Sequence, residues 1–383
     1  MFDAHIIGGG PAGLFAGISA CQQGGKVLLS EEHKKIGEPE ACSGLISLSG
    51  LESLGSYVDY KKAAINEITS AKIICSGHEF TITPKKEKAI LVSRAKFDSL
   101  AAERFIGEGG ALELGKRVTR NFQSKTVIGA DGPASSVADF FGFPKIRHFI
   151  HAMQGDFPYS CEDSHQAQIF VSSSEFPGFF GWAIPKNESE AEIGIGVSQQ
   201  HHPLHYYRNF LAKLGVRSKP SREFAAAIPS EARRKTAMKN FRGNFSALES
   251  AHAVSNTMEK GGISVLLSGD SAGQVKATTG GGVFFGSQCG ILAGKYSSSP
   301  EKYEREWRAR FGLDLALHSH FRALLNMNGG QPPKPALLLA KALFFEDLLS
   351  NEGKMDQWGS MLSPSIISSY ASIVASKFKG GKR

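Results

Sequence analysis

The stretch AHIIGGGPAG (residues 4–13) is a short apolar strand that runs directly into a glycine-rich turn. Residues 14–23 are small and apolar enough to predict a helix, and residues 26–29 predict a second strand, which ends at Glu31. The order strand, glycine turn, helix, strand and acid is typical of a dinucleotide-binding βαβ unit. The sequence therefore predicts a Rossmann-like unit at the start of the chain.

The glycines of this turn each have a physical role in such a unit. Gly8 permits the tight turn, Gly10 lets the backbone approach a pyrophosphate, and Gly13 lets the helix pack on the sheet. The start of the helix supplies free N–H groups and a partial positive charge for the phosphates. Glu31 lies eighteen residues after Gly13 and can accept hydrogen bonds from a ribose.

Two later segments favour FAD over NAD. Residues 126–132 (TVIGADG) and 263–270 (ISVLLSGD) are each an apolar strand that ends in an aspartate beside a glycine. The second aspartate, Asp270, is placed to bind ribityl hydroxyls. The turn at 280–282 opens an apolar helix over residues 283–292, whose positive end would stabilise an anionic reduced flavin. Three such segments in this order predict FAD binding.

Length and composition predict a soluble protein of more than one domain. The chain has 383 residues, 41% of them hydrophobic, which excludes wholesale disorder and supports sizeable cores. Its 44 basic and 36 acidic residues leave a net charge of +8. This charge is too diffuse for a nucleic-acid patch but suits an anionic membrane surface. No secretory signal or membrane span is expected, so the predicted location is the cytoplasm, with peripheral membrane contact left open.

Cysteine and histidine usage argue against a disulfide framework and a metal centre. The five cysteines are an odd number, widely spaced and without a CxxC pair, which fits a reducing compartment. The pairs His201–His202 and His318–His320 have no cluster of cysteine or aspartate at ligand spacing. We therefore expect no metal site.

Four segments together resemble the FAD-dependent proteins of the hydroxybenzoate hydroxylase type, and within them the geranylgeranyl reductases. They are GGGPAG (8–13), VSRAKFDSL (92–100), VIGADG (127–132) and SGDSAGQVKATTGGGVFFG (268–286). The TTGGG turn is characteristic of the reductases, which include archaeal enzymes that saturate isoprenoid lipid chains. The resemblance implies an α/β fold, α+β overall, with a Rossmann-like FAD-binding domain, an antiparallel-sheet substrate domain and a C-terminal helical region.

The resemblance also implies which residues bind FAD, which is expected to be noncovalent. It places Arg94 at the phosphates or ribose of the cofactor. The full set of expected FAD-binding residues is Gly8, Gly10, Pro11, Ala12, Gly13, Glu31, Glu32, Cys42, Arg94, Val118, Asp131, Gly132, Gly269, Asp270, Gly280, Gly281, Gly282 and Val283.

A further segment, PGFFGWAIPK (177–186), is similar to the PxxYxWxFPK segment that lines the lipid cavity of the reductases. The similarity implies that Phe180, Trp182 and Pro185 contact substrate. Phe180 and Trp182 alternate along a strand, so their rings should project from one face. Phe180 replaces the tyrosine of the family and Ile184 replaces a phenylalanine, which leaves the exact substrate open.

Two other departures concern the FAD-binding part of the chain. Ala277 stands where the family commonly has proline. The stretch between Val118 and Val127 is very short, so the β-meander usual before the VIGADG strand is expected to be missing.

The chain is expected to divide into three parts. The spacing of Tyr303, Trp307 and Phe311 predicts a helical stripe in the last part. A second stripe, at residues 366–378, is expected to dock on the protein or to lie at a lipid surface. The expected boundaries are 1–60, 88–146 and 256–300 for the FAD-binding domain, 147–255 with part of 61–87 for the substrate domain, and 301–383 for the helical region.

The segment GEPEACSG (37–44) resembles the cysteine-glycine segment that lies over the flavin on the substrate side of the reductases. This resemblance makes Cys42 the candidate catalytic acid. Reduced flavin would deliver hydride to one carbon of an alkene while an acid protonates the other. The predicted function is therefore an FAD-dependent reductase that saturates C=C bonds of geranylgeranyl chains of lipid precursors.

Two alternatives and the electron donor remain open from sequence. The residues FxWxIP at 180–185 approach the WxWxIP of flavin-dependent halogenases, which favours a monooxygenase or halogenase as one alternative. The other alternative is a non-catalytic or electron-transfer flavoprotein. Because no second GxGxxG unit is present, the reductant is NADPH bound at the flavin face or a small reduced ferredoxin-like carrier.

Overall fold

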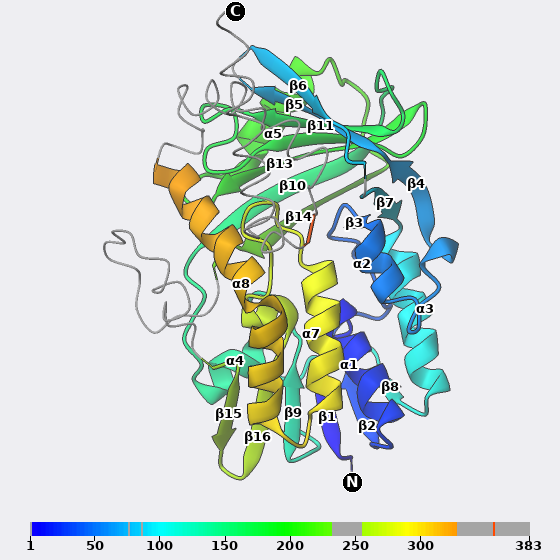
Figure 1. The fold of residues 1–383 in the computed structure, drawn as a ribbon, viewed down its shortest axis with the longest axis vertical. Helices are drawn as coiled ribbons and strands as arrows, with labels where there is room; N and C mark the ends of the chain where they lie inside the picture. Colours follow the sequence, from blue (N-terminus) through cyan, green and yellow to red (C-terminus); the bar gives the residue numbers. More distant parts are fainter. Residues whose placement is uncertain (1, 76, 86, 232–254, 328–354, 357–383) are drawn as a thin grey trace, which may run out of the picture.

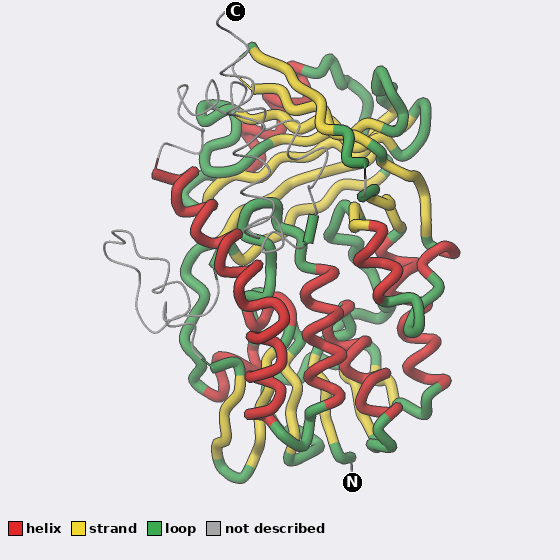
Figure 2. The backbone as a smooth tube through the Cα atoms, in the orientation of Figure 1, coloured by secondary structure: helices red, strands yellow, loops and turns green. Residues whose placement is uncertain are grey.

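Three sheets and the helices packed on them make up the protein in the computed structural model (Figure 1). The structure describes residues 2–75, 77–85, 87–231, 255–327 and 355–356. A six-stranded sheet lies at the end that holds the N-terminus, and a seven-stranded sheet lies at the opposite end (Figure 1). Several of the longest helices run between these two ends (Figure 2).

The six-stranded sheet has the strand order β15-β16-β9-β1-β2-β8, and all its pairs are parallel except β15 with β16. The expected βαβ unit is confirmed as β1, helix α1 (Pro11–Gln22) and β2. Every residue of β1 and β2 is buried. Because both faces of these strands are covered, their sequences do not alternate between apolar and polar residues. The strands are β1 (Ala4–Ile7), β2 (Val27–Ser30), β8 (Ala111–Glu113), β9 (Thr126–Gly129), β15 (Thr257–Lys260) and β16 (Ile263–Leu267).

Helices α1 and α7 (Val283–Lys295) pack side by side (Figure 1). A Cβ atom at Gly290 would lie 2.2 Å from the carbonyl oxygen of Ala12, and one at Gly294 would lie 2.1 Å from that of Ala16. Because both distances are far below van der Waals contact, only glycine allows the two backbones to approach this closely. These matched pairs show that the helices run parallel, and that α7 begins before α1 along the shared direction.

The seven-stranded sheet has the order β14-β10-β13-β12-β11-β5-β6. The expected antiparallel arrangement is confirmed except between β11 and β5, which pair in parallel. Helix α5 (Pro203–Lys213) covers one face of the sheet through Tyr207 and Phe210. The strands are β5 (Ser70–Cys75), β6 (His78–Ile82), β10 (Phe149–Pro158), β11 (Gln166–Val171), β12 (Gly181–Pro185), β13 (Glu190–Ser198) and β14 (Arg222–Pro229).

A small antiparallel sheet of order β3-β7-β4 comes from the chain between α1 and α3. Its last strand in sequence, β7, leads directly into α3, which packs on α1 through Phe97 and Phe105. These elements are β3 (Leu45–Ser47), α2 (Leu48–Ser53), η1 (Tyr60–Lys62), β4 (Ala64–Ile68), β7 (Ala89–Val92) and α3 (Arg94–Gly107).

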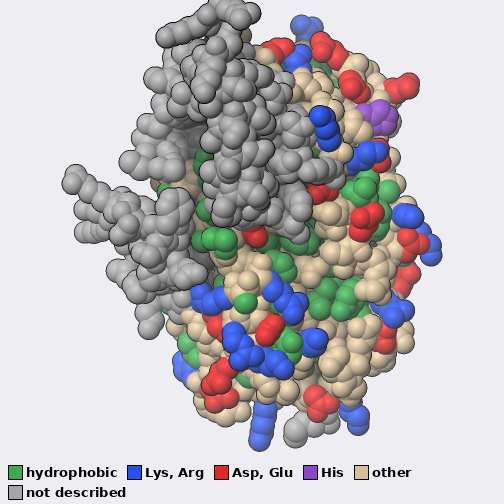
Figure 3. All heavy atoms as spheres, viewed as in Figure 1, with side chains coloured by type: hydrophobic (Ala, Val, Ile, Leu, Met, Phe, Trp, Pro, Cys, Tyr) green, Lys and Arg blue, Asp and Glu red, His purple; other side chains and the backbone are tan. Residues whose placement is uncertain are grey.

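The predicted helical stripe lies on α8 (Pro300–Met327), which packs against α7. Tyr303 and Trp307 are buried, and the Tyr303 hydroxyl donates a hydrogen bond to the carbonyl of Leu267 at 2.7 Å. Lys and Arg side chains gather over the first half of α8 (Figure 3). Arg308 pairs with Glu304 and Arg310 with Glu306, so this face carries both signs of charge.

The fold class predicted from the sequence is confirmed. The chain from residue 114 to 125 forms no strand, as expected from the short stretch before β9. The apolar stripe at residues 366–378 lies outside the described residues. None of the described helices has the length and apolar character needed to cross a membrane.

Candidate functional site

A cavity of about 650 Å³ lies between the end of the six-stranded sheet and one face of the seven-stranded sheet. Its size is within the range typical of ligand sites. It brings together most of the residues expected from the sequence to bind FAD or substrate. Those that line it are Gly10, Pro11, Ala12, Cys42, Arg94, Gly132, Phe180, Trp182, Gly269, Asp270, Gly280, Gly281, Gly282 and Val283.

The first glycine turn leaves open space in front of α1. A Cβ atom at Gly10 would meet nothing within 4 Å, and no side chain caps the helix there. Gly8 and Gly13 shape the turn from outside the cavity: Gly8 has a φ of +105°, and a Cβ at Gly13 would lie 1.9 Å from the Gly8 carbonyl oxygen. The free N–H groups of α1 therefore face a space that fits a pyrophosphate.

Glu31 follows β2 directly and is bonded to the turn it was expected to serve. One carboxylate oxygen accepts the N–H of Gly9 at 2.6 Å, and the other accepts the N–H of His33 at 2.9 Å. The His33 ring Nδ1 also lies 2.5 Å from a Glu31 carboxylate oxygen. A carboxylate has about four acceptor positions, so one remains for a ribose hydroxyl. Neither Glu31 nor the neighbouring Glu32 lines the cavity, and the exposed Glu32 carboxylate lies 3.6 Å from the Arg117 side chain.

Two expected FAD-binding residues face the protein interior instead of the cavity. Asp131 accepts hydrogen bonds from the Ser135 hydroxyl at 2.6 Å and from the Val137 N–H at 3.1 Å, which ties it to helix α4 (Ser136–Phe141). The Val118 side chain packs in the apolar cluster around Val127. At the end of β9 only Gly132, next to Asp131, reaches the cavity lining.

Asp270 and the glycine turn at 280–282, the other residues expected to bind FAD, lie together at the start of α7. Asp270, in the short helix η2 (Gly269–Ala272), lies so close to Gly282 that a Cβ there would be 2.8 Å from its carboxylate oxygen. Burial raises the pKa of Asp270 to about 6, although the guanidinium of Arg94 opposes the shift. No side chain caps α7 at Gly282, so its positive end also faces the cavity.

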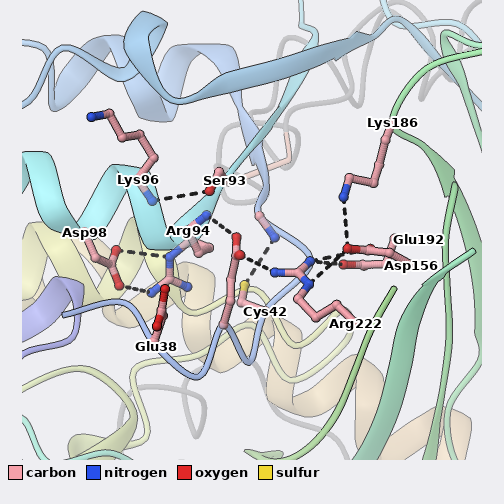
Figure 4. Close-up of polar contacts among 12 residues, drawn as sticks. Glu38, Cys42, Ser93, Arg94, Lys96, Asp98, Asp156, Lys186, Glu192 and Arg222 are labelled. Carbon is pink, nitrogen blue, oxygen red and sulfur yellow. Dashed lines mark hydrogen bonds and ion pairs between the residues drawn. The ribbon is translucent and has the colours of Figure 1, made fainter. Parts of the chain in front are cut away.

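Cys42 and Arg94 both line the cavity, and Figure 4 shows the polar contacts around them. The Arg94 guanidinium forms an ion pair with Asp98, with an N–O distance of 2.8 Å, and its charge lies beside the Cys42 thiol. Burial alone would lower the pKa of Arg94, but Asp98 and Cys42 together raise it above its ordinary value. The Cys42 sulfur accepts the N–H of Gly44 at 3.4 Å. Arg94 is therefore a buried charge beside Cys42.

The wall opposite the glycine turns is one face of the seven-stranded sheet. Because side chains alternate along a strand, Trp182 and Ile184 face the cavity whereas Ile193 and Ile195 of the paired strand pack towards α5. A Cβ at Gly194 would lie 2.4 Å from the Trp182 ring, so glycine gives this ring its space.

Aromatic rings dominate this wall, as the sequence predicted for Phe180 and Trp182. Phe180 stacks on Phe179 with ring centroids 4.2 Å apart, and its edge-to-face contact with Trp182 has centroids 5.8 Å apart. Pro185 does not line the cavity, because side chains alternate along β12 and the cavity face holds Trp182 and Ile184. The Pro185 carbonyl accepts a hydrogen bond from Asn66 at 2.9 Å. The expectation that Pro185 contacts substrate is not supported by this position.

Sequence reasoning did not single out several polar residues at the cavity. Lys276 forms a buried ion pair with Asp356 at 2.6 Å, and Asp356 also accepts a hydrogen bond from Ser47. His318, from α8, is bonded to the Thr278 hydroxyl at 2.6 Å, and burial together with the Lys276 ammonium lowers its pKa to about 3. These partners come from segments far apart in the chain, so no local sequence pattern connects them.

Comparisons with known proteins agree with this geometry. Two family models described as FAD binding domains match residues 3–71 and 108–288. The protein is an FAD-dependent oxidoreductase. The open N-terminal ends of α1 and α7 and the space at Gly10 fit this cofactor. In the part of the chain that the structure describes, no group of histidine, cysteine or acidic residues is arranged to hold a metal ion.

The resemblance of this oxidoreductase to the geranylgeranyl reductases is also confirmed. It is 27% identical to digeranylgeranylglycerophospholipid reductase 1 of Methanococcoides burtonii over 82% of each chain. It is 25% identical to the digeranylgeranylglycerophospholipid reductase of Methanocaldococcus jannaschii, over 85% of this chain and 87% of that one.

Solved structures share the fold of this oxidoreductase. A geranylgeranyl bacteriochlorophyll reductase-like protein from Thermoplasma acidophilum superposes with a TM-score of 0.73 at 19% identity, covering 99% of this chain and 98% of that one. A flavin-dependent brominase superposes with a TM-score of 0.64 at 17% identity, covering 99% of both chains. At these identities the likeness concerns the fold alone.

Replacing Glu31 by alanine should weaken FAD retention. The variant loses the ribose acceptor and also the hydrogen bond that holds Gly9, so we expect the dissociation constant of FAD to rise about tenfold, as for one lost charge-assisted hydrogen bond. Titration of the apoprotein with FAD, followed by flavin fluorescence, measures this constant. Glu32→Ala is the matched control, and equal affinities of the two variants would remove Glu31 from this role.

Proposed function

We propose that this oxidoreductase saturates carbon–carbon double bonds in the geranylgeranyl chains of lipid precursors. The observation that carries the proposal is that one cavity holds the FAD-type glycine turns, Cys42 and an aromatic wall made by Phe180 and Trp182. An apolar wall binds a prenyl chain by burying its surface and excludes water from the reacting alkene. The names of the archaeal relatives support the same substrate class.

When bound, reduced FAD supplies the hydride for such a reaction. We propose that Cys42 supplies the proton, so that one alkene carbon gains hydride, the other gains the thiol proton, and the double bond becomes single. The positive charge of Arg94 beside the thiol would stabilise the thiolate left behind. Water then returns a proton to Cys42. The rings of Phe180 and Trp182 hold the chain in contact, which a poor hydride acceptor requires.

Electron supply and location are further parts of the proposal. The reductant is NADPH or a small ferredoxin-like carrier, and FAD is held noncovalently. We also propose that the protein is cytoplasmic and contacts the membrane surface peripherally to reach its lipid substrate. The +8 net charge of the chain would favour an anionic membrane.

The direct test is lipid mass spectrometry of cells that make an unsaturated archaeal-type lipid, with and without this protein. We expect a mass gain of one H2 for each bond reduced. A Trp182→Ala variant that still binds FAD should give less saturated lipid, because its cavity wall is incomplete. A flavin-loaded protein that leaves every prenyl chain unsaturated with either reductant contradicts the proposal, and oxygen-dependent turnover would instead indicate a monooxygenase.

A further inference from the structure

We propose that Glu40 and Arg222 are positioning residues, whose ion pair holds the Cys42-bearing segment against the seven-stranded sheet. The segment is residues 38–44, which form neither helix nor strand. Figure 4 shows Arg222 reaching from its strand towards this segment. The positioning of Cys42 by this ion pair does not depend on the reaction, whereas the expected effect on turnover rests on the function proposed above.

Glu40 joins two parts of the molecule from a place two residues before Cys42. One of its carboxylate oxygens accepts the backbone N–H of Arg94, the first residue of α3, at 2.5 Å. The other oxygen forms the ion pair with Arg222 at the start of β14. The positive end of α3 favours a carboxylate at this place. Only 15% of the Glu40 side chain is exposed, so the pair is screened less than a surface ion pair.

The charges around Arg222 direct it towards Glu40. Its Nε donates to Asp156 at 3.0 Å, and Lys186 donates to the same carboxylate oxygen at 2.9 Å. Asp156 is therefore already matched by two cations, which leaves the Nη1 end of Arg222 for Glu40. Glu192, 3.7 Å from Arg222, competes little at neutral pH because burial and the charge of Asp156 raise its pKa to about 8.

The ion pair restricts Cys42 through Arg94 as well as through the chain. Arg94 donates its backbone N–H to Glu40, and the charge of its guanidinium lies beside the Cys42 thiol. The carbonyl of Gly44, at the other end of the segment, accepts the N–H of Val92 at 3.0 Å. Without the ion pair between Arg222 and Glu40, the segment is held less firmly between Glu40 and Gly44 and becomes more mobile. Cys42 would then leave its position at the cavity edge for part of the time.

The test is the alkylation rate of Cys42 in the FAD-loaded Glu40→Gln variant. Glutamine keeps the size and the acceptor for the Arg94 N–H but removes the charge that binds Arg222. We expect iodoacetamide to modify Cys42 about tenfold faster than in the unsubstituted protein, a typical coupling for a partly buried pair. Peptide mass spectrometry separates Cys42 from the buried Cys289, whose rate should not change unless the whole protein loosens.

A matched control lies on the same segment. Glu38→Gln makes the same chemical change at an exposed glutamate that pairs with Lys35, and the Cys42 rate should stay unchanged. Arg222→Gln should reproduce the Glu40→Gln rate, and the double variant should be no faster, because both changes remove one interaction. Equal Cys42 rates in the Glu40 and Glu38 variants would overturn the proposal. So would a rise in Cys42 alkylation matched by Cys289.

Turnover supplies a second readout. In Glu40→Gln, kcat for prenyl-chain reduction should fall about tenfold, as expected for a misplaced reacting group, while KM stays within about twofold. Failure of the unsubstituted protein to reduce any prenyl chain would contradict the proposed function only. The alkylation rates would still decide whether Glu40 and Arg222 hold Cys42 in place.

Discussion

Cys42→Ser should keep its fold and its FAD but lose about two orders of magnitude in alkene reduction, the lower range for removal of a proton donor. The substitution should change the free energy of unfolding little, because Cys42 lines the cavity and serine can accept the Gly44 N–H as the thiol does. It is costly for the reaction because an alcohol is a far weaker acid than a thiol. Melting temperature, bound flavin and prenyl-chain reduction, measured on one preparation, test all three expectations.

The matched control for this variant is Cys161→Ser, at a cysteine outside the cavity lining. It should leave turnover per bound FAD unchanged. Normal turnover in Cys42→Ser would remove Cys42 from the mechanism and leave ordered water as the proton source. A drop of roughly 1–3 kcal/mol in stability with normal turnover would instead make Cys42 a structural thiol.

Glu192→Gln should become steadily more stable than the unsubstituted protein as the pH rises from about 5 to 8. Burial, with the charge of Asp156, raises the pKa of Glu192 from 4.5 to about 8, while Arg222, Lys186 and the Trp182 N–H oppose the shift. Between these values the unfolded chain releases the proton and the folded chain keeps it, so the unsubstituted protein loses up to about 1.4 kcal/mol per pH unit. Glutamine does not ionise and avoids this loss.

Urea unfolding of both proteins from pH 4 to 9 measures the difference. It should be flat below about pH 4.5, grow through the interval and level off above about pH 8, where Glu192 is ionised in both states. Glu190→Gln, on the same strand and 34% exposed, should show no such growth. A difference that does not change with pH would mean that Glu192 is already ionised at neutral pH.

The parts of the site that the sequence predicted well are those set by local spacing. The segment GGGPAG fixes a turn and a helix start within a few residues, so Gly10, Pro11 and Ala12 are found at the cavity as expected. The period of two along a strand likewise placed Phe180 and Trp182 on one face. In both cases the backbone geometry of one segment decides the outcome.

The parts that the sequence did not predict depend on pairing between distant segments. Glu40 and Arg222, or Lys276 and Asp356, are ordinary charged residues until the fold brings them together. Asp131 has the expected position at a strand end, yet its carboxylate binds the start of α4, which no spacing rule distinguishes from a cofactor contact. Pro185 was predicted to contact substrate only because it belongs to the same motif as Trp182, and it does not line the cavity.

The close packing of α1 against α7 has a consequence for how the protein is made. The surface of α1 around Ala12 and Ala16 is matched by Gly290 and Gly294, which leave the ribosome far later. Throughout most of synthesis this face of α1 therefore has no partner, although α3 covers another part of the helix. In the seven-stranded sheet, strands β10 to β14 follow one another in sequence and can pair soon after they are made, whereas β5 and β6 wait for β11. Until α7 emerges, the exposed face of α1 can aggregate with other chains. Chaperones act during intervals of this kind.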